Sequence, residues 1–249
     1  DDDGYSLPSE LRESQKRLET IRAAKERLEA EARAKHALSE ANGAEREGKD
    51  VAPATPSERA QSNFTDPDSR IMHAPDGFQQ CYNAQVAVDQ DTLLIVGNTL
   101  SNHPNDKAEA LPTVDAIPAE VGKPTASALD NGYFSAKNIE GFEARQIEAY
   151  IATGREPHHK SWQERFAEQP TPPPDEASPI VKMAYKLQTD LGQAIYGLRK
   201  CTVEPVIGII KEVLGFRQFS LRGLAAAAGE WCLVCLAFNL KRLHVLLDH

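Results

Sequence analysis

The sequence lacks several features that would define a protein class directly. It has four cysteines, and its single C-x-x-C pair, Cys232 and Cys235, has no second pair to complete a zinc site, so buried thiols in a reducing compartment are the simpler interpretation. No run of about eighteen apolar residues is present, and we expect no membrane span. The first residues, Asp-Asp-Asp-Gly, are the opposite of a signal peptide. These absences favour a cytoplasmic globular protein.

The charge is unevenly distributed along the chain. The net charge of −9 argues at first against nucleic-acid binding. Residues 182–249, however, carry nine Lys or Arg against five Asp or Glu, so the acidic excess lies entirely in the preceding part. The overall charge is therefore a poor guide to partners, although such an asymmetry is also ordinary surface variation.

Hydrophobic periodicity predicts a long helix followed by an α/β region. Leu11, Leu18, Ile21 and Leu28 form a narrow apolar stripe among many charges, which indicates an exposed helix or coiled-coil arm over residues 8–41. We expect strands over 78–88, 92–96, 125–129 and 148–152, the first two as a hairpin, with a helix over 107–117 and further helices from 187 to the end, broken near Gly215 and Gly223.

These elements suggest four segments. They are an arm and linker over 1–62, an α/β core over 63–155, a Pro-rich mobile insertion over 156–186 and a C-terminal helical part of the core over 187–249. The insertion contains His158 and His159, which a solvated loop explains better than a metal site, because adjacent residues rarely bind one ion together.

The stretch from Tyr196 to Lys211 carries the most specific pattern. On a helix, Glu204 and Lys211 share one face roughly 10 Å apart, with Gly208 between them. The rest of the helix is apolar and should face the core: Val203, Val206, Ile207, Ile210, Val213 and Leu214. Something large could approach between the carboxylate and the ammonium group. An isolated Glu–Lys pair, by contrast, is usually only a solvated surface pair.

The order of Tyr196, Arg199, Glu204 and Lys211 resembles the glutamate signature of bacterial insertion-sequence transposases of the DDE type. The flanking Val-Glu-Pro-Val-Ile-Gly and Gly215-Phe-Arg-Gln-Phe strings and the segment from Glu230 to Arg242 are similar to the same family. Asp130-Asn-Gly-Tyr-Phe-Ser135 by itself is good turn chemistry, and Ser135 can cap a helix that runs through Glu143. It also resembles the turn that carries the second catalytic Asp in these transposases.

The resemblance implies an RNase H-like fold, with a mixed sheet and flanking helices. It implies that Asp130 and Glu204 are catalytic and bind Mg²⁺, or Mn²⁺ as a substitute, in a two-metal site. It further implies that Tyr196, Arg199 and Lys211 bind phosphates of double-stranded DNA at transposon ends. We expect the Asp130 and Glu204 carboxylates to converge.

One element of the resemblance has no counterpart in the sequence. The family's first Asp lies on a strand that precedes the long helix, and no such strand is encoded here. We therefore expect an incomplete sheet, an unpaired edge that makes the isolated chain poorly soluble or oligomeric, and no cleavage by this chain alone. Asp89 is a possible substitute ligand. The alternatives are a non-enzymatic DNA-binding or interaction remnant, and a nuclease that recruits Asp89 or Asp68.

Overall fold

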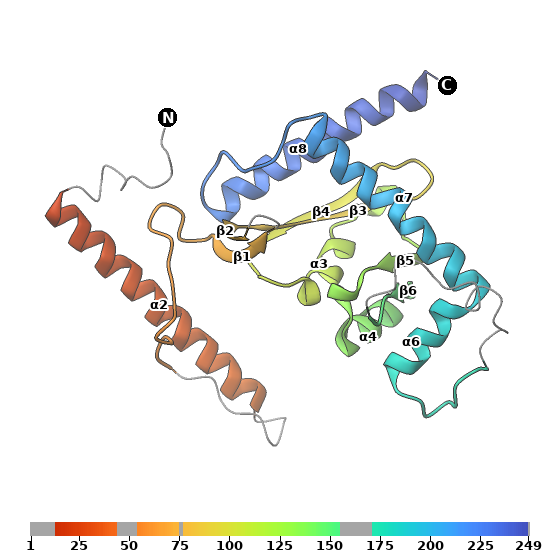
Figure 1. The fold of residues 1–249 in the computed structure, drawn as a ribbon, viewed down its shortest axis with the longest axis horizontal. Coiled ribbons are helices and arrows are strands. Elements are labelled where there is room, and N and C mark those ends of the chain that lie inside the picture. The colour runs from red at the N-terminus through yellow and green to blue at the C-terminus, as the bar shows by residue number, and fades with distance from the viewer. Residues whose placement is uncertain (1–12, 44–53, 75–76, 155–170, 249) are drawn as a thin grey trace. The chain divides into compact units, whose positions relative to one another are not determined.

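The computed structural model describes residues 13–43, 54–74, 77–154 and 171–248 (Figure 1). These residues form six α-helices and three two-stranded sheets, so the predicted mixed α/β class is confirmed. The chain divides into two compact units, residues 1–81 and residues 82–249. Of the predicted insertion over 156–186, residues 156–170, including His158 and His159, lie outside the described residues, whereas residues 179–186 belong to a helix and not to a loop.

The first unit contains the predicted long helix, α2 (Ser14–Gly43), and a short hairpin of β1 (Arg70–Ala74) and β2 (Gly77–Cys81). Leu18 and Ile21 on α2 are exposed, which agrees with the narrow apolar stripe in the sequence. Small side chains form the buried positions of the helix, and Arg70 pairs with Glu31 at 2.7 Å. This unit has little apolar core of its own.

The second unit begins with an antiparallel hairpin of β3 (Asn83–Val88) and β4 (Ile95–Ser101). The predicted hairpin is confirmed over residues 83–101, but the predicted strand 78–88 is divided at Tyr82 between β2 and β3, which belong to different sheets. The second strand of the hairpin begins three residues later than the sequence suggested. The cause is the turn: Asp89 accepts hydrogen bonds from both the backbone and the hydroxyl of Thr92, which keeps Thr92 out of the ladder.

A β-α-β unit follows, made of β5 (Ala126–Leu129), α4 (Ala136–Ala144) and β6 (Glu148–Ile151). The strands pair in parallel, with Leu129 opposite Ile151. Ser135 caps α4 as predicted, since its hydroxyl accepts from the Asn138 N–H at 3.1 Å. The short helix α3 (Ala110–Asp115) precedes β5 and packs against both β3 and β4.

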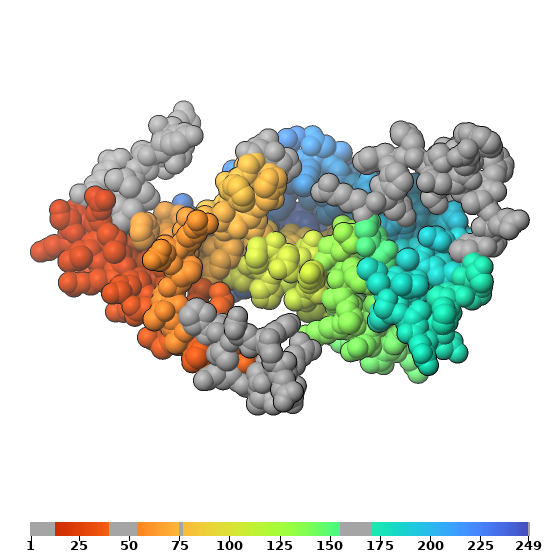
Figure 2. Space-filling view, turned by 60° about the horizontal axis from the view of Figure 1, so that its bottom comes forward, coloured from red at the N-terminus to blue at the C-terminus, as the bar shows by residue number. Residues whose placement is uncertain are grey.

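Three helices complete the unit: α6 (Pro179–Gln188), α7 (Asp190–Glu212) and α8 (Leu224–Leu247). Helix α6 covers the β-α-β unit, where Met183 packs in one core with Phe142 and Ile151. Figure 2 shows α4 in green and α6 in cyan side by side on one face. They enclose a small pocket lined by Glu143, Lys182 and their neighbours.

A second core lies on the β3–β4 hairpin, where Val206, Ile210, Trp231 and Phe238 pack around Ile95. Helices α7 and α8 are separated at the predicted glycines, Gly215 (φ 73°) and Gly223 (φ 84°), whose backbone is left-handed. Val213, which the sequence suggested for the core, is exposed. It comes directly after α7, where the helix no longer covers the hairpin.

Candidate functional site

The site is built around a cavity between two strands that do not pair with each other. In the described residues β3 pairs with β4 and β5 pairs with β6, so β3 and β5 each keep one edge without a strand partner. A cavity of about 540 Å³ lies between them. Helix α3 lines the cavity together with one face of α7, which contributes Leu198, Arg199 and Thr202.

Asp130 lies at one end of this cavity, directly after β5. Its Oδ1 accepts from the Gly132 N–H at 2.8 Å and caps the short 3₁₀ turn Asn131–Tyr133. A methyl group added at Gly132 would lie 3.0 Å from Oδ2 of Asp106 and 3.1 Å from Oδ1 of Asp130. The two carboxylates therefore approach the same point, from different segments of the chain.

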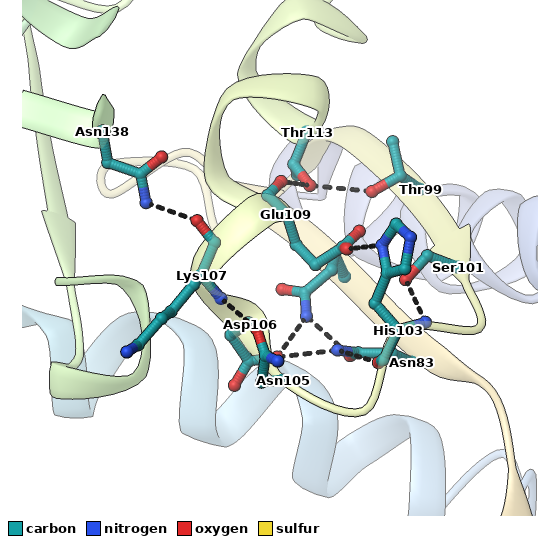
Figure 3. Close-up of polar contacts among 11 residues, drawn as sticks. Asn83, Thr99, Ser101, His103, Asn105, Asp106, Lys107, Glu109, Thr113 and Asn138 are labelled. Carbon is teal, nitrogen blue, oxygen red and sulfur yellow. Dashed lines mark hydrogen bonds and ion pairs between the residues drawn. The ribbon is translucent and has the colours of Figure 1, made fainter. Parts of the chain in front are cut away.

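Asp106 is held by amide side chains from β3 (Figure 3). Its Oδ1 accepts from Nδ2 of Asn83 at 2.8 Å and from Nε2 of Gln85 at 2.9 Å. Tyr133, from the turn after β5, donates its hydroxyl proton to Oε1 of Gln85. A polar network thus joins the start of β3 to the end of β5.

Tyr133 remains a hydrogen-bond donor throughout the ordinary pH range. Burial raises its pKa, and the nearby carboxylates of Asp106, Asp130 and Glu109 raise it further. Glu109 is itself buried and contacts Nδ1 of His103 at 2.6 Å (Figure 3). The end of the cavity is therefore acidic, with a protonated phenol among the carboxylates.

The signature residues lie on one long helix, α7. Tyr196 is buried, and the guanidinium of Arg199 lies 5.6 Å from the centre of its ring. Arg199 is also 4.0 Å from the exposed carboxylate of Glu204, at the outer limit for an ion pair. Its Nε is buried and makes no hydrogen bond to the described residues. Lys211 is exposed in the last turn.

The structure brings Asp130 and Arg199 to one cavity. Glu204 does not line that cavity; its side chain is exposed and its ion pair is with Arg199. Pro205, inside α7, follows it directly. Lys211 lies two turns further along the helix, roughly 10 Å from Glu204.

Asp89 lines the cavity at the opposite end from Asp130. The contact between Gln85 and Tyr133 shows that β3 starts where β5 ends, so the two strands run in opposite directions. Asp89 is four residues beyond Gln85, which is roughly 13 Å along a strand. Hydrogen bonds from the Thr92 side chain and backbone lower the pKa of Asp89 and use its carboxylate in the turn.

Within the described ranges, no three His, Cys, Asp or Glu side chains are grouped closely enough to hold a metal ion. The C-x-x-C pair is part of no such group either. Cys235 is buried and burial raises its pKa to about 12, whereas Cys232 and Cys201 are exposed. The buried-thiol interpretation therefore holds for Cys235 and is wrong for Cys232.

The roles of Asp106 and Gln85 were not predicted from the sequence. Asp106 directly follows Asn102-His-Pro-Asn105, a pattern typical of a loop. A signal was nevertheless present, because Asn83 and Gln85 alternate along a strand and so project from the same face. Two amide side chains on one strand face need a polar partner, and here both donate to the Asp106 carboxylate.

Comparison with known proteins supports the resemblance. Residues 175–244 match the family described as the transposase DDE domain, a range that includes α6, α7 and most of α8. No curated protein and no solved structure matches the chain. Over residues 175–244 the chain is thus similar to the DDE domain of transposases.

Proposed function

We propose that residues 82–249 act on DNA as part of an insertion-sequence transposase, with an RNase H-like arrangement of strands and helices. The single observation that carries the proposal is the match over residues 175–244, which contains the whole pattern from Tyr196 to Lys211. The α/β architecture supports it, with one helix against two strand pairs whose facing edges are unpaired.

In this proposal Arg199 and Lys211 contact DNA phosphates from α7. Tyr196, to which the resemblance also assigns a phosphate contact, is buried, so its proposed part is to support the Arg199 guanidinium over its ring. Arg199 suits a phosphate because its Nε is buried without a hydrogen bond to the described residues and its ion pair with Glu204 is long. Lys211 adds an exposed positive charge. Gly208 between Glu204 and Lys211 leaves room for a backbone to approach, since nothing lies within 4 Å of a methyl group added there.

Asp130 and Glu204 are the proposed metal-binding carboxylates, and Mg²⁺ with hard oxygen ligands is the ion such carboxylates select. The described residues do not fit a complete site, since they contain no group of three possible ligands. We therefore derive no cleavage step through a metal ion. We expect the chain alone to bind DNA without cleaving it.

Binding is tested by fluorescence anisotropy with a labelled duplex between about 50 and 200 mM salt. Lys211→Ala should weaken binding and lower the slope of log K against log salt by about 1, because one phosphate contact is lost. Lys123→Ala, an exposed lysine in the loop before β5, is the matched control and should change neither. Equal effects of the two variants, or no binding by the parent at 50 mM salt, would contradict the proposal that α7 contacts DNA.

A glycine pair on α7 tests the close approach. Gly208→Ala and Gly197→Ala both place a methyl group in open space, so both variants should fold. If DNA lies between Glu204 and Lys211, only Gly208→Ala should reduce affinity. A loss shared by both variants would indicate a general effect on α7.

The second candidate is a DNA-binding or interaction remnant without catalysis, which the lack of a complete ligand group in the described residues favours. Supercoiled plasmid with Mn²⁺ separates the two functions. No nicking with salt-sensitive binding supports the remnant. If Asp130→Ala and Glu204→Ala both abolish nicking, another carboxylate must complete the site. Asp106→Ala is then the first further variant to test, because the Asp106 carboxylate lies near that of Asp130.

A further inference from the structure

Helix α8 has two apolar faces, and the described part of the chain packs against one of them. Ala227, Trp231, Cys235 and Phe238 are buried, and the last three pack against the β3–β4 hairpin. On the other side is a row of exposed leucines, between 41 and 83% exposed, which we call the leucine stripe: Leu233, Leu236, Leu240, Leu243 and Leu247. Because both faces are apolar, α8 has the composition of a helix that could cross a membrane, and it is also long enough to do so.

The spacing of the leucine stripe is that of a coiled coil. Its leucines alternate three and four residues apart, which places them in one seam roughly 21 Å long. A helix that packs into such a seam needs the same spacing. Helix α2, the other long exposed helix in the described chain, interrupts this spacing with Lys25 and Lys35.

The positions beside the stripe carry no permanent charge. They are Cys232, Ala237, Asn239, His244 and Leu246. Arg242 faces the hairpin instead, where its Nε donates to the Thr92 carbonyl at 2.7 Å. Two copies of this surface can therefore meet without like-charge repulsion.

The apolar area is that of a weak but specific contact. The stripe exposes on the order of 500 Å², within the range of patches that mark interaction sites. Two stripes facing each other would bury on the order of 1,000 Å², the lower limit for a biological interface. A dimer with a dissociation constant in the micromolar range is the expected result.

We propose that the leucine stripe is a self-association surface, occupied by α8 of a second copy of this chain. An identical helix meets the spacing requirement without any further protein, and a two-fold axis pairs the same patch on both copies. This inference does not depend on the proposed DNA chemistry, because the stripe excludes Arg199, Glu204 and Lys211.

Sedimentation velocity over about 1 to 100 μM tests the proposal. Leu236→Glu and Leu240→Glu each put a charge in the centre of the stripe and should give monomers at every concentration. Leu191→Glu is the matched control, because Leu191 has the same 60% exposure as Leu240 but lies on α7. The control and the parent chain should dimerise as the concentration rises. Circular dichroism should be the same for all four proteins, since every substituted side chain is exposed.

Three outcomes would overturn the proposal. A parent chain that stays monomeric at 100 μM has no such dimer. If dimers persist in both stripe variants, the interface lies elsewhere, for instance at the free strand edges. A monomeric parent that co-sediments with phosphatidylcholine–phosphatidylglycerol vesicles, when the stripe variants do not, would assign the stripe to a lipid surface.

Discussion

The side chain of Asn239 hydrogen bonds to both backbone groups of Ile95: Nδ2 donates to the carbonyl at 2.8 Å, and Oδ1 accepts from the N–H at 2.9 Å. Ile95 is the buried first residue of β4, so these bonds fix α8 in one position along the strand. The Trp231 indole N–H does the same on β3, where it donates to the Gln85 carbonyl at 3.1 Å. Asn239 and Trp231 belong to the transposase-like flank of the sequence, and their role here is structural.

Asn239→Ala should lower the free energy of unfolding by about 2 kcal/mol, because it leaves a donor and an acceptor of Ile95 without partners near the core. Lys241→Ala, an exposed change on the same helix, should stay within about 0.5 kcal/mol. Urea unfolding followed by circular dichroism measures both. Similar losses for the two variants would mean that the amide pair contributes little.

Two glycines in α7 should respond in opposite directions to alanine. At Gly192 a methyl group would lie 1.9 Å from the carbonyl oxygen of Lys186, which belongs to the backbone of α6 and cannot move aside easily. Gly192→Ala should therefore cost about 2 kcal/mol or more by overpacking. Gly197→Ala meets open space and should stabilise the helix by about 0.5 to 1 kcal/mol. Thermal melts of the two variants, compared with the parent, measure the difference in sign.

The turn between β3 and β4 should weaken in acid. The Thr92 side chain and backbone hold the pKa of Asp89 below its ordinary value, so their contribution is present above pH about 4 and is lost as the pH falls below it. Thr92→Val should destabilise by less than about 1 kcal/mol at pH 7, because the pair is partly solvated. At pH 3 the difference between variant and parent should shrink. If the difference in stability between Thr92→Val and the parent is the same at pH 3 and pH 7, Thr92 does not act by binding the charged form of Asp89.

Thiol labelling should separate the cysteines. Cys235 is buried with a pKa of about 12, so almost no thiolate is present at pH 8, whereas Cys201 and Cys232 are exposed. A thiol reagent should modify Cys201 and Cys232 rapidly in the native protein and all four cysteines in denaturant. Burial also raises the pKa of Cys81, so its labelling should lag behind that of the exposed pair. Mass spectrometry of tryptic peptides assigns each site.

The local elements were largely predictable from the sequence, because periodicity and turn chemistry are local. The hairpin, both strands of the β-α-β unit, the Ser135 cap and the breaks at Gly215 and Gly223 follow from neighbouring residues alone. The start of β4 did not, since the side chain of Asp89 forms the turn that delays it.

How residues far apart in the sequence come together in the fold was less predictable. The sequence marked Asp130 and Arg199 separately, and the fold brings both to one cavity. The sequence contained no direct indication that the carboxylates of Asp106 and Asp130 would both lie beside Gly132, because this depends on how the 3₁₀ turn Asp106–Ala108 packs against the turn after β5. The convergence of Glu204 with Asp130 stays a prediction.

Helix α7 contacts strands of both pairs, β3 of one and β5 and β6 of the other. Its first half, with Leu198 and Thr202, faces the cavity beside β5, and its second half, with Val206 and Ile210, packs on the hairpin. Pro205, which donates no backbone hydrogen bond, lies between the halves. Because one helix contacts both strand pairs, we expect the two pairs to unfold as one cooperative unit. Their slowest-exchanging amides should therefore open with a common free energy.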